Sequence, residues 1–332
     1  MANRSACLIF NPVAGQGNAD QDLALIQSIL EPEINLDIIQ TTPETDVGQL
    51  ATHALEQGAE IIIASGGDGT VSAAATALMG TNIPLGVISR GTANAFANAL
   101  DLPVAIAPAC EAILAGTTRV VDVATCNGLP MVLLTGIGFE AETVELADRD
   151  AKKRLGIAAY VLAGLEQLRS LEQFEVEIET EEKIVTVSAA AVTIANAAPP
   201  TSILAQGPAG VVFDDGLLDL TIVAPMSKLG AIAASYDLLS STLRGEAAQR
   251  PDIGFLRAKR FKVTADPPQK VVLDGEMIGH TPVEVECIPG GLTVFAPQTE
   301  PTQPIEKLEG LPNLTVTLKE ESSESKLTES PE

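Results

Sequence analysis

The first hundred residues alternate short apolar runs with longer helix-like stretches, and this alternation constrains the fold more strongly than any other feature of the chain. The apolar runs predict strands over residues 6–10, 34–40, 59–64 and 85–88. The stretches that follow them predict helices over residues 20–30, 46–57, 70–79 and 93–100. Strands that alternate with helices are typical of a mostly parallel sheet with helices on its faces. We therefore expect an α/β domain over residues 1–125.

From about residue 120 the apolar residues tend to alternate with polar ones, and short turns follow one another closely. We expect strands over residues 120–125, 131–135, 174–179, 184–196, 217–224, 260–264, 270–273, 283–287 and 292–296. Two helical stretches, 141–151 and 155–171, interrupt them. This pattern favours a second, mainly antiparallel domain over residues 126–296.

Residues 297–332 are rich in Pro, Glu, Ser and Thr, with eight glutamates against three lysines. Such a composition buries little apolar surface, so we expect an acidic and flexible tail. Within it, residues 314–318 alternate enough to add an edge strand, and we expect that strand to pair with an edge of the N-terminal sheet.

Charge and cysteine content restrict the partners and the compartment. The formal net charge of −24 disfavours nucleic acid, because binding to it depends on Lys and Arg. It also disfavours general adhesion to an anionic membrane, although a basic group would allow a local contact: Arg149, Lys152, Lys153 and Arg154. Four cysteines without regular spacing are typical of reduced thiols in a cytosolic protein. No segment could span a bilayer, so we expect a soluble, cytoplasmic protein with at most peripheral membrane contact.

Three turns rich in Gly or Asn follow predicted strands of the first domain: "NPVAG" (11–15), "SGGDGT" (65–70) and "SRGTAN" (89–94). In open α/β sheets, ligands bind at the carboxyl ends of the strands, where these turns fall. The turns offer backbone N–H groups and short polar side chains to the phosphates of a nucleotide, from Asn11, Gly66, Gly67, Gly69, Thr70 and Thr92. Asp68 would hold Mg²⁺ against the same phosphates. Alternatively each turn merely connects a strand to a helix, and no Walker A motif is present.

Several motifs occur together and in order: "NPVAG", "SGGDGT", "PLGVISRGTAN", "GIGFEAE" (136–142), "FDDGLLDL" (213–220) and "LDGE" (273–276). Over residues 6 to about 296 the chain resembles the diacylglycerol kinase catalytic-domain family, and more closely its bacterial soluble lipid kinases. The resemblance implies an ATP- and Mg²⁺-dependent enzyme that moves the γ-phosphoryl of ATP to a lipid hydroxyl. It also implies an N-terminal domain similar to that of NAD kinases, a C-terminal β-sandwich, and an active site between the two.

The resemblance further implies roles for individual residues. ATP would be contacted by Asn11, Thr42, Gly66, Gly67, Asp68, Gly69, Thr70 and Thr92. Glu276 would be the catalytic base, and Asp68 would act with it in catalysis. Asp215 would bind a structural Mg²⁺, helped by backbone carbonyls near Val212 and Leu217. From the residues alone, "DDGLLD" would be an ordinary acidic turn and "LDGE" a plain hairpin.

One position departs from the family pattern, in which the glycine–threonine turn usually continues Asn-Asp. Here Asn94 is followed by Ala95, as in the sphingoid-base kinase relatives, which puts diacylglycerol in doubt as the acceptor. We therefore keep three functions: a lipid kinase acting on a lipid at a membrane surface, an NAD kinase-like enzyme with a soluble acceptor, and an inactive nucleotide-binding regulator. "LDGE" and "DDG" favour the lipid kinase, and the presence of both Asp68 and Glu276 favours an active enzyme. The oligomeric state stays open, with a homodimer as one alternative.

Overall fold

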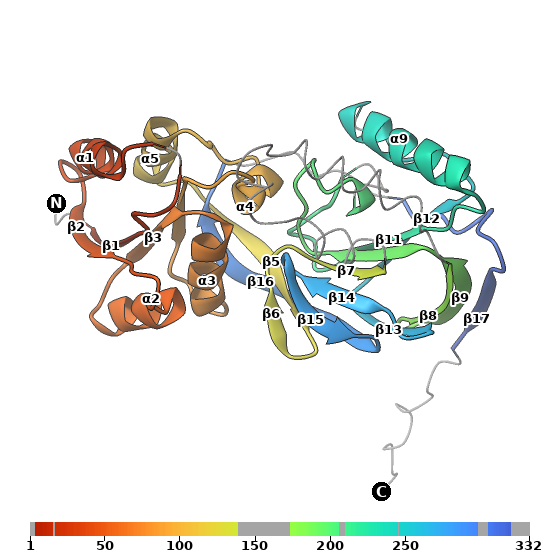
Figure 1. Cartoon of the computed structure of the whole chain (residues 1–332). Coiled ribbons are helices and arrows are strands. Elements are labelled where there is room, and N and C mark those ends of the chain that lie inside the picture. Colours follow the sequence, from red (N-terminus) through yellow and green to blue (C-terminus); the bar gives the residue numbers. More distant parts are fainter. Residues whose placement is uncertain are drawn as a thin grey trace, which may run out of the picture.

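The computed structural model describes residues 4–15, 17–138, 173–205, 210–244, 246–297 and 305–319. The helices expected over 141–151 and 155–171, and the basic group at 149–154, lie outside the described residues. Figure 1 shows an N-terminal part with helices on both sides of a sheet, followed by a part built mainly of strands.

Four parallel strands form the N-terminal part of the larger sheet, in the order β4-β3-β1-β2. Their bounds are Ser5–Phe10 (β1), Asn35–Gln40 (β2), Ile61–Gly66 (β3) and Leu85–Ser89 (β4). Nearly every residue of β1, β3 and β4 is buried, which is typical of parallel strands covered on both faces. This confirms the mostly parallel sheet expected from the alternating pattern.

Helices cover the two faces of this sheet through separate apolar clusters. Helices α1 (Ala19–Leu30) and α5 (Ile106–Ala115) pack on one face around Leu8 and Phe10. Helices α2 (Val47–Glu56) and α3 (Asp68–Leu78) pack on the other around Ile9 and Val87, as the two helix pairs in Figure 1 show. A short helix, α4 (Ala95–Ala99), follows the "SRGTAN" turn. Helix α5 was not expected from the sequence.

The larger sheet continues from one domain into the other. Strand β16 (Val283–Phe295) pairs in parallel with β4 near its end and antiparallel with β5 (Thr118–Cys126) along its length. Near its start it also pairs with β13 (Arg260–Asp266). Beyond β13 the sheet continues through β8 (Phe174–Glu179) and β9 (Lys183–Ala189), while β6 (Leu129–Met131) pairs with β5. The two domains are therefore joined by a shared sheet of eleven strands.

A second sheet of six antiparallel strands packs against the C-terminal part of the first. Its order is β12-β11-β10-β7-β14-β15. The bounds are Ile253–Ala258 (β12), Leu218–Val223 (β11), Ala191–Ala195 (β10), Leu134–Gly138 (β7), Lys270–Leu273 (β14) and Glu276–His280 (β15). Helix α9 (Lys228–Arg244) and the turn η2 (Ile203–Ala205) pack against β10, β11 and β12. The predicted antiparallel domain is thus a β-sandwich.

Residues 305–319 depart from the flexible tail expected over 297–332. Lys307 forms a β-bridge with Phe255, and Leu311 is buried over Gly254. Strand β17 (Thr315–Leu318) pairs with β9, at the opposite edge of the larger sheet from β2. The edge strand is therefore present as expected, but its partner belongs to the sandwich and not to the N-terminal domain. Averaging the composition of the tail concealed its apolar anchors: Leu311 is buried, and Leu308 and Leu314 pack against the same core.

Candidate active site

The carboxyl ends of β1, β3 and β4 bring the three predicted turns into direct contact. The backbone N–H of Asn11 donates to the carbonyl of Ser65 at 2.8 Å, and that of Arg90 donates to the carbonyl of Gly66 at 2.7 Å. The Asn11 side-chain Nδ2 donates to Thr70 Oγ1 at 3.1 Å. The sequence prediction that these turns share one edge of the sheet is therefore confirmed by the structure.

Two glycines allow close packing in this region: Gly91 between the second and third turns, and Gly66 within the second. A Cβ atom on Gly91 would lie 2.9 Å from the Cα of Gly67, and one on Gly66 would lie 2.5 Å from Thr70 Oγ1. Glycine is required at both positions, because backbone occupies the space of a side chain at Gly91 and the Thr70 side chain occupies it at Gly66. Gly69 differs, since a Cβ atom at that position would meet nothing within 4 Å.

Asp68 begins helix α3 and also caps helix α4. Its Oδ1 accepts the backbone N–H of Ala95 at 2.5 Å. The cap residue of α4, Asn94, has a left-handed backbone (φ 48°) and makes no capping bond of its own. The Oδ2 atom of Asp68 receives no hydrogen bond from the described residues. A carboxylate oxygen left open beside a helix N-terminus and the glycine turn suits a Mg²⁺ ion that also contacts phosphate oxygens.

Arg90 is a residue of this sheet edge that the sequence analysis missed. Its side chain is 1% exposed, and its Nε donates to Asp22 of α1 at 2.9 Å. Its Nη1 donates to the carbonyl of Asn11 at 2.7 Å, and the guanidinium lies 4.4 Å from the ring centre of Phe10. Arg90 thus fixes the "NPVAG" turn to β4 and α1. The available signal was that Arg90 is the only basic residue in the three turns.

The remaining ATP residues implied by the resemblance lie at the rim of this edge. Thr92 is exposed in the same turn as Arg90 and Gly91. Thr42 follows β2 and is also exposed, and its N–H donates to Thr45 Oγ1 at 2.8 Å. Among the described residues, no hydrogen bond joins Thr42 to the three turns. The structure therefore brings together Asn11, Gly66–Thr70 and Thr92, with Thr42 on the neighbouring strand end.

Glu276 is exposed and is the first residue of β15, directly after a tight turn. Both turn residues, Asp274 and Gly275, have left-handed backbones, with φ values of 48° and 91°. The Asp274 carboxylate accepts the backbone N–H groups of Val132, Leu133 and Leu134 at 2.8, 3.0 and 2.9 Å. Burial raises the pKa of Asp274 to about 6, although these three donors lower it. The "LDGE" segment is thus a hairpin, and its aspartate fastens the hairpin to the start of β7.

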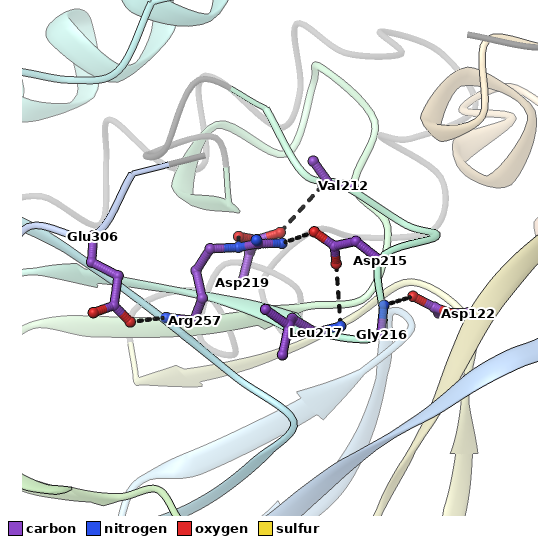
Figure 2. Close-up of polar contacts among 8 residues, drawn as sticks. All are labelled: Asp122, Val212, Asp215, Gly216, Leu217, Asp219, Arg257 and Glu306. Carbon is purple, nitrogen blue, oxygen red and sulfur yellow. Dashed lines mark hydrogen bonds and ion pairs between the residues drawn. The ribbon is translucent and has the colours of Figure 1, made fainter. Parts of the chain in front are cut away.

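The implied metal-binding segment forms a different arrangement, drawn in Figure 2. Arg257 lies between two acids: its Nη2 donates to Asp215 at 2.8 Å, and its Nε donates to Asp219 at 2.6 Å. The backbone N–H of Leu217 donates to the other oxygen of Asp215 at 3.2 Å, and that of Val212 donates to Asp219 at 3.3 Å. Burial raises the pKa of Asp219 to about 6, against the lowering effect of Arg257.

In this arrangement Asp215 is paired with a cation and does not stand free for a Mg²⁺ ion. Both oxygens of Asp215 are already engaged, and the positive guanidinium lies where a metal would need a free carboxylate. Val212 and Leu217 approach the acids with their N–H groups, and the role implied for backbone carbonyls near these residues stays a prediction. Within the described part of the chain, no group of three or more His, Cys, Asp or Glu could hold a metal ion. The structure does place Asp215, Val212 and Leu217 around Arg257, whose positive charge balances those of Asp215 and Asp219.

The same acidic turn is attached to the strands that join the two domains. Asp122 of β5 accepts the N–H groups of Gly216 at 2.6 Å and Gly290 at 2.8 Å. Arg119 donates to Asp214 through Nε at 2.8 Å and Nη2 at 2.6 Å. The "DDG" turn therefore links β5, β11 and the bend of β16, a structural role that the sequence alone did not indicate.

Comparison with known proteins identifies the family. Residues 5–126 match the family model of the diacylglycerol kinase catalytic domain, and residues 134–296 match that of the YegS C-terminal NAD kinase beta sandwich-like domain. The chain is also 30% identical to the diacylglycerol kinase of Bacillus subtilis (strain 168), over 90% of this chain and 99% of the relative. The chain belongs to the diacylglycerol kinase catalytic-domain family.

Other members of this family agree in sequence and fold. An uncharacterized protein of Synechocystis sp. (strain ATCC 27184 / PCC 6803 / Kazusa) is 50% identical over 87% of this chain and 70% of its own length. A crystal structure of a diacylglycerol kinase from Bacillus anthracis str. Sterne is 25% identical and superposes with a TM-score of 0.69, over 90% of this chain and 98% of that one. These findings confirm the expected family, the α/β domain and the β-sandwich. Among the described residues, no helix is long and apolar enough to cross a membrane.

Proposed function

We propose that this protein is an ATP- and Mg²⁺-dependent lipid kinase, which transfers the γ-phosphoryl of ATP to the hydroxyl of a lipid presented at a membrane surface. The observation that carries the proposal is the contact of the three turns around the start of α3. Backbone N–H groups at a helix N-terminus bind phosphate well, and the three turns supply glycine backbone and short polar groups around that terminus. Membership of a family with lipid kinases supports the choice of acceptor.

Each residue of the site has a separate task in this proposal. Asn11, Gly66, Gly67, Gly69, Thr70 and Thr92 bind and orient the phosphates of ATP, and Thr42 contributes from the end of β2. Asp68, through its Oδ2, would hold Mg²⁺, which when bound neutralises the negative charge of the transferred phosphoryl group. Glu276 accepts the proton of the lipid hydroxyl while the new oxygen–phosphorus bond forms. The bond between the γ-phosphorus and the bridging oxygen breaks, and ADP leaves.

The residue at position 95 bears on which lipid accepts the phosphoryl group. The backbone N–H of Ala95 donates to Asp68, and any residue other than proline would supply it; the Ala95 methyl group packs against the apolar cluster of Phe96 and Leu100. A carboxylate at this position is therefore not needed to hold the turn. Its absence removes a negative charge beside Asp68, and we propose an acceptor related to sphingoid bases or diacylglycerol.

The test is transfer of labelled phosphate from γ-labelled ATP to a panel of diacylglycerols, monoacylglycerols and sphingoid bases in detergent micelles, with NAD as a soluble acceptor. Labelled lipid from the wild type, with a decrease of about 10²–10⁴-fold in kcat for Glu276→Gln, is the expected result. Labelled NAD in place of lipid would favour the NAD kinase-like alternative. ATP binding without transfer to any acceptor would favour the inactive regulator.

A further inference from the structure

The aspartate of the "LDGE" hairpin makes more hydrogen bonds than its turn requires. Its Oδ2 accepts the N–H of Val132 at 2.8 Å, and its Oδ1 accepts those of Leu133 at 3.0 Å and Leu134 at 2.9 Å. Its own backbone N–H donates to the carbonyl of Leu134 at 2.9 Å. Four hydrogen bonds thus join a single turn residue to a segment about 140 positions earlier in the chain.

The segment that Asp274 holds is itself fixed by packing. Val132, Leu133 and Leu134 are buried and belong to one apolar cluster with Phe96 and Leu100, which lie in and just after α4. Helix α4 in turn is capped by Asp68. A continuous chain of contacts therefore runs from the phosphate-binding turns, through α4 and the start of β7, to the hairpin that carries Glu276.

The two strands of this hairpin are held differently: β14 pairs with β7 from Val271 to Leu273. Strand β15 is the edge of the six-stranded sheet and pairs only with β14, and all but one of its residues are exposed. The pairing of β14 with β15 shifts register between Val271 and Val272. The ladder between β14 and β7 ends at Leu273, so beyond it the hydrogen bonds of Asp274 join the turn that precedes Glu276 to the start of β7.

We propose that Asp274 is the positioning residue for Glu276: its carboxylate fastens the hairpin to residues 132–134, so that Glu276 is held beside the site of phosphoryl transfer. This inference rests on the proposed function for the role of Glu276. A turn alone would need only a residue that accepts a left-handed backbone, and asparagine does so as well as aspartate. The use of both carboxylate oxygens as acceptors is what a plain turn does not explain.

The test compares Asp274→Asn with Asp101→Asn. Asp101 has a similar left-handed backbone (φ 54°) and is exposed, and it receives no hydrogen bond from the described residues, so it is a matched control. Asparagine at 274 keeps the turn but replaces one acceptor oxygen by an N–H donor. We expect kcat to fall by about 10–100-fold, as for a small misplacement of a reacting group, with KM for ATP unchanged. Asp101→Asn should match the wild type.

A double variant separates positioning from an independent effect. If Asp274 acts through Glu276, then Asp274→Asn costs little in a Glu276→Gln background, because the two effects are coupled. Equal losses in both backgrounds, or a kcat for Asp274→Asn within threefold of the wild type, would overturn the proposal.

Amide hydrogen exchange tests the same contact without any kinase assay. Peptides that cover residues 132–134 and 275–280 should exchange faster in Asp274→Asn than in the wild type. Unchanged exchange in both peptides would overturn the proposal even if the acceptor lipid were never found. A wild type without lipid kinase activity, but with faster exchange in the variant, would instead overturn the proposed function and leave the contact established.

Discussion

The Oδ1 atom of Asp68 accepts the N–H of Ala95, whereas its Oδ2 atom accepts no hydrogen bond from the part of the chain that the structure describes. Asparagine and alanine at this position therefore have different consequences. Asp68→Asn keeps an oxygen for Ala95 but loses the charge that would bind Mg²⁺. Asp68→Ala loses both, and the missing cap should lower the stability by about 1 kcal/mol.

We expect Asp68→Asn to melt at nearly the wild-type temperature while its kcat falls by at least about 100-fold. Asp68→Ala should lose both activity and thermal stability. Thermal melting and initial rates at saturating ATP measure the two effects. A rate for Asp68→Asn close to the wild type would show that Asp68 serves only as the cap of α4.

The four cysteines are free and buried, and this determines their reactivity. Burial raises the pKa of Cys7 and Cys110 to about 11 and that of Cys287 to about 12, and it also raises the pKa of Cys126. Since only the thiolate reacts, a raised pKa leaves little reactive form at neutral pH. We expect a thiol reagent at pH 8 to label none of them quickly in the native protein and all four in denaturant. Rapid labelling of one cysteine would show that its segment opens readily.

At the scale of elements, the approach of the "SGGDGT" and "SRGTAN" turns depends on Gly91, which has no room for a side chain against Gly67. Gly69 lies in the same region but faces open space. Gly91→Ala should therefore push the two turns apart and lower both the melting temperature and the rate. Gly69→Ala should leave the melting temperature unchanged but raise KM for ATP, because its methyl group would enter the space of the phosphates. An unchanged KM for Gly69→Ala would place the nucleotide elsewhere.

Arg257 is the counter-charge of the acidic residues around which the family resemblance implied a metal. Its charge neutralises Asp215 and the fully buried Asp219, so we expect the free protein to melt at the same temperature with Mg²⁺ and with a chelator. Arg257→Met would leave Asp219 buried without its counter-charge, a change that costs roughly 3–5 kcal/mol. The double variant Arg257→Met/Asp219→Asn should recover part of that loss. A clear drop in melting temperature with chelator would instead indicate a metal in this domain.

The elements that could be predicted were those whose signal lies within the element itself. The four strands of the first domain are short apolar runs, and each helix between them has a regular apolar face. Helix α5 was missed because Pro108 interrupts its sequence, although proline is tolerated in the first turn of a helix. The strand expected over 184–196 is two strands, β9 and β10, because the chain passes from one sheet to the other at Ala190.

The site was predictable where residues act through a local motif, and less so where distant residues meet. The turns of Asp68 and the hairpin of Glu276 carry their own sequence signatures. Asp274 was noticed only as a turn residue, since its partners lie about 140 residues away. Arg257 lies in a basic stretch without a motif, and its two acids are 38 and 42 residues earlier. Such pairings follow from the order of strands in the sandwich, which the sequence did not reveal.

At the scale of the whole molecule, residues 305–319 act as a strap across the sandwich. Lys307 exchanges two backbone hydrogen bonds with Phe255 and donates its ammonium to the carbonyls of Arg250 and Ile253. Glu306 accepts the backbone N–H of Arg257 at 2.9 Å, next to the acidic turn in Figure 2. Strand β17 then covers the edge of β9. The strap thus contacts both sheets of the sandwich: β12 of the six-stranded sheet and β9 of the larger sheet.

The strap predicts different outcomes for two truncations. A chain that ends at Thr299 loses the strap, and burial of Leu311 alone is worth about 1.5–3 kcal/mol. We expect its melting temperature to fall by roughly 5 °C or more, and lipid kinase activity to fall with it as the support of Arg257 weakens. A chain that ends at Glu320 keeps every contact described for the strap, so it should match the full chain. Lys307→Met in the full chain should reproduce part of the loss, because the buried carbonyls of Arg250 and Ile253 then lack their donor. Equal melting temperatures for the two truncated chains would mean that the sandwich is complete without residues 305–319.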